Sequence, residues 1–93
     1  MSIGLAIAKV AEYTDKHADA LEKVNQAELE LEMTVSKGAE GRQSSVYRQA
    51  MEQLTKYKTL AGLYKDFLDF WNNVIKSVME MLKKAGELAV GSR

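Results

Sequence analysis

The sequence predicts an all-α protein folded as an antiparallel two-helix hairpin, and three features indicate this. The chain of 93 residues has no proline and is rich in residues that favour helices. Apolar residues recur at alternating spacings of three and four along two long segments, as they do on one side of a helix. Between these segments lies SKGAEGRQSS (36–45), where glycine and small polar residues gather. We therefore expect one helical domain over residues 1–93 that assembles into a four-helix bundle or a larger helical oligomer.

The first predicted helix covers about residues 2–37. One stripe of residues follows the four-and-three spacing along its whole length, flanked by Tyr13 and by alanines. The stripe consists of Ile3, Ile7, Val10, Thr14, His17, Leu21, Val24, Glu28, Leu31 and Val35. We expect this side of the first helix to pack against the second helix.

The predicted turn covers residues 38–44. Gly38 is suited to the left-handed conformation that ends many helices, because glycine has no Cβ to clash there. Ser44 or Ser45 can cap the next helix by accepting a hydrogen bond from a free N–H group. If the chain folds back near residue 40, facing residues have numbers that sum to about 80. This register places His17 near Tyr64.

The second predicted helix covers about residues 45–85, or slightly beyond, with Gly86 as a candidate end. Its core stripe again has heptad spacing. The stripe consists of Tyr47, Ala50, Leu54, Tyr57, Ala61, Tyr64, Leu68, Trp71, Ile75, Val78, Leu82, Ala85 and Ala89. Gly62, next to Ala61, indicates either a close crossing of two helices or a kink.

A second apolar stripe runs beside the first on this helix, and one partner helix cannot cover both. Full burial of each such side chain contributes about 1.5–3 kcal/mol, so exposure of the stripe favours association. We predict a partner-binding surface formed by Leu60, Leu63, Phe67, Phe70, Trp71, Val74, Val78 and Met81. Phe67, Phe70 and Trp71 are the expected anchors. The expected partner is a second copy of this chain or another helical protein.

The charge pattern argues against several other partners. The chain has 13 basic and 13 acidic residues, and its longest basic run is the pair Lys83-Lys84, so we expect no nucleic-acid binding. We also expect neither a membrane-spanning segment nor a cleavable signal peptide. An amphipathic helix lying on a membrane surface remains an alternative, although the polar side of the second helix mixes both signs of charge.

The sequence offers little material for catalysis. It contains no cysteine and only one histidine, His17, whereas a metal site needs several converging ligands. Acidic pairs such as Asp66 and Asp69 share one side of a helix, but nothing around them predicts a pocket. We therefore expect a non-enzymatic protein without a metal, a cofactor or a small-molecule substrate, in which His17 is a partly buried histidine.

The turn also carries a recognisable pattern, Ala39-x-Gly41-x-x-x-x-Val46-Tyr47-x-x-x-Met51-x-x-Leu54. This pattern resembles the Trp-x-Gly turn of the WXG family, the early-secreted-antigen-like helical hairpins exported by bacterial type VII secretion. The resemblance implies that Gly41 helps to close the hairpin and that Tyr47 opens the second helix. It also implies a small secretion-system substrate or partner, found in the bacterial cytoplasm or exported without a cleavable signal peptide.

The chain departs from this family in two respects. Ala39 stands where the family has tryptophan, and no acidic residue lies four positions after Tyr57 or Tyr64, where the family's export signal would require one. The hairpin architecture is also similar to that of the needle and rod subunits of type III secretion, which pack into filaments. A small secretion chaperone and an unrelated dimeric helical regulatory protein are the remaining alternatives.

Overall fold

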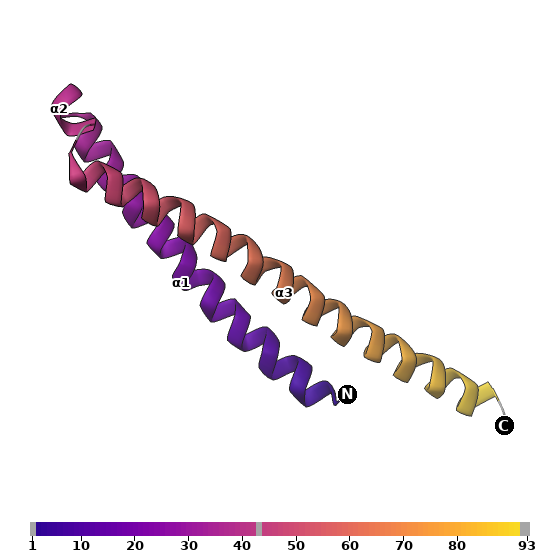
Figure 1. Ribbon diagram of the computed structural model, residues 1–93. Helices are drawn as coiled ribbons and strands as arrows, with labels where there is room; N and C mark the ends of the chain where they lie inside the picture. The colour runs from indigo at the N-terminus through magenta and orange to yellow at the C-terminus, as the bar shows by residue number, and fades with distance from the viewer. Residues whose placement is uncertain (1, 43, 92–93) are drawn as a thin grey trace.

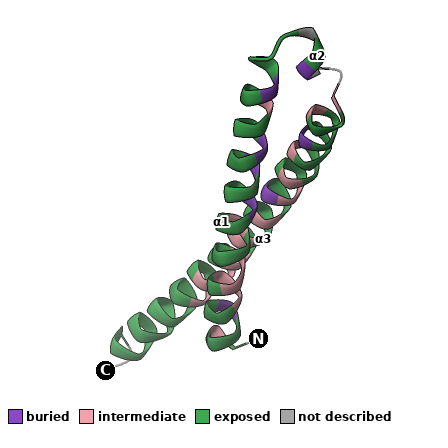
Figure 2. Cartoon of the chain, turned by 90° about the vertical axis from the view of Figure 1, so that its left-hand side faces the viewer, coloured by how far each residue is buried: buried purple, intermediate pink, exposed green. Residues whose placement is uncertain are grey.

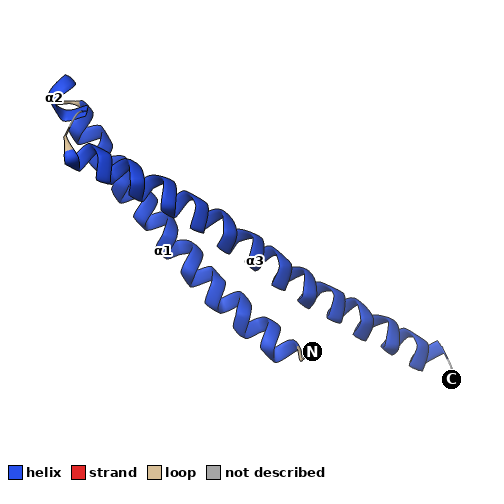
Figure 3. Ribbon diagram, viewed as in Figure 1, coloured by secondary structure: helices blue, strands red, loops and turns tan. Residues whose placement is uncertain are grey.

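The computed structural model describes residues 2–42 and 44–91, which form an antiparallel hairpin of two long helices (Figure 1). Helix α1 is Ile3–Val35, the short α2 is Ala39–Arg42, and α3 is Ser45–Gly91. Figure 3 shows helix over almost the whole of this part of the chain, so the prediction of an all-α hairpin is confirmed. Met1, Gln43, Ser92 and Arg93, which the predicted domain includes, lie outside the described residues.

Helix α1 begins after Ser2, whose Oγ accepts a hydrogen bond from the Leu5 N–H at 3.2 Å. It ends at Val35, two residues before the predicted end at residue 37. The N–H of Gly38 donates to the Val35 carbonyl at 2.9 Å, which closes a turn over the last two predicted helical residues. Gly38 has a φ of 78°, and this confirms the predicted left-handed conformation.

The turn contains a short helix, α2, that the sequence analysis did not predict. Gly41 in this helix is buried against the end of α1, and a Cβ at this position would collide with the Thr34 carbonyl oxygen. Ser44 then caps α3, because its Oγ accepts a hydrogen bond from the Tyr47 N–H at 3.1 Å and donates one to the Gly41 carbonyl at 2.6 Å. Because a Cβ at position 41 would collide with the Thr34 carbonyl oxygen, only glycine fits there without a shift of the backbone.

The face of α1 that packs against α3 combines every second residue of the predicted stripe with residues of a neighbouring stripe. All of its members are buried or half-buried: Ile3, Ala6, Val10, Tyr13, His17, Ala20, Val24, Ala27, Leu31 and Thr34. The other half of the predicted stripe is wrong, because Ile7, Thr14, Leu21, Glu28 and Val35 are exposed. Alanine allows a close approach of α3, whose larger side chains fill the space, so small residues take the positions expected for larger ones.

The predicted stripe on α3 is correct from Tyr47 to Val78 and wrong beyond it. Leu82, Ala85 and Ala89 are exposed, because α3 has 47 residues and α1 only 33, so α3 extends past the start of α1 (Figure 2). Gly86 does not end α3. Gly62 marks no close crossing, since a Cβ built on it meets no other group within 4 Å.

The register of the hairpin follows from ring contacts between the two helices. The Tyr13 ring of α1 lies 6.2 Å from the Tyr64 ring and 5.1 Å from the Phe67 ring of α3. The residue numbers of these two pairs sum to 77 and 80, close to the expected sum. The residue packed against Tyr64 is Tyr13, one helical turn before the expected His17.

Candidate protein-interaction surface

The predicted partner-binding residues all lie on α3 and divide into two groups. Exposed members are Leu63, Phe67, Phe70 and Met81, with exposed fractions of 45%, 40%, 52% and 70%. Half-buried members are Leu60, Trp71, Val74 and Val78. The predicted turn residues Gly38, Gly41 and Tyr47 lie at or beside the turn, away from this group.

Aromatic rings gather at the middle of the exposed group. The Tyr13 and Phe67 rings are tilted by 31° to each other, and the Phe70 and Trp71 rings meet edge to face at 5.1 Å. Aromatic pairs of this kind add about 0.5–1.5 kcal/mol beyond the burial of their area. Helix α1 contributes Tyr13 to this cluster, and no binding role was predicted for this residue.

The cluster surrounds an open hollow of about 500 Å³. Its lining consists of Lys9, Tyr13, Asp66, Phe67, Phe70 and Trp71. The walls are mainly aromatic and the two charged groups come from different helices, so the hollow suits a large apolar side chain.

A second open hollow, of about 190 Å³, lies further toward the turn. Its lining consists of Lys16, Asp19, Ala20, Lys23, Tyr57, Leu60 and Tyr64. The two hollows share one face of the hairpin, which we name the aromatic face. Lys9, Lys16 and Lys23 border this face from α1, because residues seven apart lie on one side of a helix.

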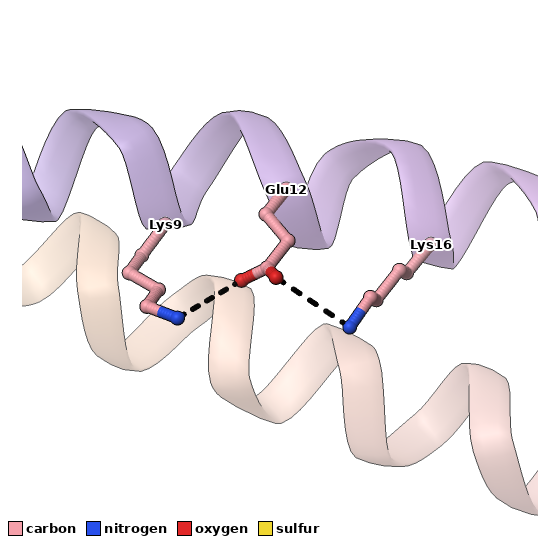
Figure 4. A network of polar contacts seen from close by, with 3 residues as sticks. All are labelled: Lys9, Glu12 and Lys16. Carbon is pink, nitrogen blue, oxygen red and sulfur yellow. Dashed lines mark hydrogen bonds and ion pairs between the residues drawn. The ribbon is translucent and has the colours of Figure 1, made fainter.

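Glu12 joins two of these lysines into a network along the border. Its carboxylate lies 3.2 Å from the Lys9 Nζ and 3.6 Å from the Lys16 Nζ (Figure 4). The hydrogen bond from Lys9 is the main reason that the pKa of Glu12 is lowered from its usual 4.5. The Lys16 Nζ also lies 5.4 Å from the centre of the Tyr13 ring. The border of the aromatic face therefore has a small excess of positive charge, with three lysines against the carboxylates of Glu12 and Asp19, and Glu12 holds two of the lysines beside the rings.

The opposite face of the hairpin carries a different apolar stripe, on α1. Ile7 and Leu21 lie two residues from Lys9 and Lys23, which is about 200° around a helix and hence on the other side. We name this the small-residue stripe, formed by the exposed residues Ile7, Ala11, Thr14, Ala18 and Leu21. The Thr14 hydroxyl donates to the Val10 carbonyl at 2.7 Å, so its polar group is already satisfied. This surface was not predicted from the sequence, because Ile7, Thr14 and Leu21 fit the spacing of the core stripe.

Within residues 2–42 and 44–91, no three side chains of the types that ligate metals lie close enough to hold an ion. No helix in the described part of the chain combines the length and apolar character needed to cross a bilayer. No known protein family, characterised protein or solved structure matches this chain.

Proposed function

We propose that this chain is a non-catalytic interaction protein that associates with other helices through the aromatic face. The observation that carries the proposal is the exposure of Phe67 and Phe70, at 40% and 52%, in the middle of the long helix α3. Contiguous apolar surface of this kind marks interaction sites in proteins.

The energetics require the whole stripe to be covered together. Each of these side chains is already partly covered, so complete burial of Leu63, Phe67 and Phe70 adds roughly 1 kcal/mol apiece. Association costs at least about 4 kcal/mol in lost freedom of motion. A single anchor is therefore insufficient, and the partner has to present a helix that contacts several turns of α3 at once.

The test is a pair of substitutions on opposite sides of α3, read by sedimentation equilibrium. Phe70→Asp places a charge in the hollow. The Phe70 ring that it removes packs on Trp71 of the same helix, so the substitution spares the contact between α3 and α1. We expect this variant to lose self-association by at least about tenfold. The control is Lys65→Ala, which removes an exposed ion pair with Asp69 and should leave association unchanged.

Circular dichroism is the control measurement, which tests whether the Phe70→Asp variant keeps its helix content. A folded Phe70→Asp protein that associates as tightly as the unmodified chain would show that the aromatic face is not the binding surface. The same measurement on Phe67→Asp is a second reading, although Phe67 also packs on Tyr13 and its loss weakens the hairpin itself.

We further propose a setting for this association in bacterial secretion, as a small substrate or partner. The resemblance of the turn to the WXG family supports this setting, together with the fit of Gly41 against Thr34, where a side chain has no room. The experiment is expression in a bacterium with a type VII system, followed by assay of the culture medium. Export that continues unchanged after deletion of that system would contradict the setting without affecting the proposed association.

A further inference from the structure

We infer that the occupant of the aromatic face is α1 of a second copy of this chain, bound through its small-residue stripe. The inference rests on the proposed function and adds the identity of the partner surface. The small-residue stripe is exposed, as are Leu63, Phe67 and Phe70 of the aromatic face, and the two surfaces lie on opposite faces of one hairpin. When surface patches that bind each other lie on different sides of a molecule, each copy binds one neighbour on either side. Copies of this chain then stack in an open series.

The two stripes match in length and in the size of their side chains. Each covers fifteen residues from first to last member, Leu60 to Val74 and Ile7 to Leu21, or roughly 21 Å of helix. They pair antiparallel as Leu60 with Leu21, Leu63 with Ala18, Phe67 with Thr14, Phe70 with Ala11 and Val74 with Ile7. In the three central pairs a large side chain faces a small one, and branched aliphatic residues meet at both ends. This alternation lets two helices interdigitate closely.

The register of this contact is almost that of the hairpin itself. Every pair in it has residue numbers that sum to 81, against 77 and 80 for the contacts of Tyr13 with Tyr64 and Phe67 within one chain. The neighbour therefore stacks at nearly the same level, with a shift along the helix axis of no more than about one turn. Helix α3 then lies between two α1 helices, its own on one side and the neighbour's on another.

Charged residues on the borders of the two stripes are complementary in this arrangement. The α1 helices of adjacent copies run in the same direction at the same level. Asp15 and Glu22, on the outer border of the small-residue stripe, then approach Lys16 and Lys23 on the border of the next copy's aromatic face. Exposed pairs of this kind contribute little energy, but they favour one register over its alternatives.

A closed dimer is disfavoured by the same charges. In a closed dimer the second copy would also place its α3 over the side of the first copy's α1 that borders the aromatic face, and Lys58 and Lys65 would then face Lys16 and Lys23. Lys58 and Lys65 lie two residues from Leu60 and Phe67, and hence on the side of α3 away from the aromatic face. Alternatively, two aromatic faces packed on each other would leave Ile7 and Leu21 exposed on both copies.

The test uses two variants that each block one of the two surfaces at facing positions. Phe70→Asp blocks the aromatic face, and Ala11→Asp blocks the small-residue stripe at the position paired with Phe70. Each variant alone should be a monomer, because every contact needs both surfaces. Mixed in equal amounts they should form a one-to-one pair that grows no further, since each supplies the surface that the other lacks. Multi-angle light scattering after size-exclusion chromatography measures this directly.

The matched control is Ala85→Asp, the same substitution at an exposed alanine of α3 beyond the contact, which should assemble like the unmodified chain. Circular dichroism confirms that all variants keep their helices. An Ala11→Asp protein that still associates normally, beside a monomeric Phe70→Asp, would overturn this inference while the proposed function stands. A mixture of two folded monomeric variants that forms no pair would overturn it as well. Normal assembly of Phe70→Asp would overturn both.

Discussion

The ring of Tyr13 on α1 lies 5.1 Å from the ring of Phe67 on α3, and this contact joins the hairpin core to its exposed surface. Tyr13 is half-buried between the helices, and it also lines the hollow of the aromatic face. One side chain thus contributes to the register of the hairpin and to the shape of the binding surface. Its loss should affect stability and association together.

We predict that Tyr13→Ala lowers the free energy of unfolding by about 2 kcal/mol, roughly half the loss expected for a fully buried aromatic residue. The reason is the loss of the ring contacts with Tyr64 and Phe67. Urea denaturation at one fixed low protein concentration measures the change. Tyr13→Phe keeps the ring and is the control, with a loss below about 0.5 kcal/mol expected. Equal losses in both variants would contradict the role given to the ring.

Gly41→Ala should destabilise the hairpin by about 1–3 kcal/mol, because the new methyl group collides with the Thr34 carbonyl oxygen and forces α2 away from α1. The measurement is again urea denaturation. A stability equal to that of the unmodified chain would mean that α2 does not pack on α1 as described.

Gly62→Ala should have the opposite effect and stabilise the chain by about 1 kcal/mol, since alanine favours the helix interior more than glycine does. A Cβ at this position of α3 meets no other group within 4 Å, so no contact offsets the gain. Comparison of thermal midpoints with and without the substitution tests this. A lower midpoint would indicate that a neighbouring chain approaches α3 at Gly62.

The pKa of Glu12 should lie below 4.5, and replacement of Lys9 by alanine should raise it more than replacement of Lys16, because the hydrogen bond from Lys9 is the larger cause. A lowered pKa means that the folded chain favours the carboxylate. This stabilisation is therefore present above the pKa of the unfolded chain and is lost as the pH falls through the folded value. Carbon-13 NMR titration of the Glu12 carboxyl follows the change, and a midpoint unaltered by Lys9→Ala would contradict it.

Much of the fold was predictable from the sequence, because heptad spacing and the glycine-rich turn define two helices and their antiparallel order. The side of α1 that packs on α3 was not predictable. Hydrophobicity favoured Ile7 over Ala6 as a core residue, whereas close packing against α3 required the smaller side chain. The extent of the core was not predictable either. The apolar pattern continues through Leu82, but α1 begins at Ile3, and this first turn does not reach far enough along α3 to cover Leu82.

The candidate surface was predictable in part for a related reason. The stripe from Leu60 to Val74 lies within one helix and is visible in its spacing. Lys9 and Tyr13 of α1 also line the hollow. Their position beside Phe67 can be predicted only when the register between α1 and α3 is known to within one helical turn. The small-residue stripe was concealed because its larger members fit the core pattern equally well.

Sedimentation equilibrium of the unmodified chain over a wide range of concentrations tests the central claim most directly, namely that the aromatic face is covered by another copy. We predict an average mass that rises steadily with concentration and passes the mass of a dimer, as an open series requires. A mass that stays at that of a single chain at the highest concentrations would contradict the claim.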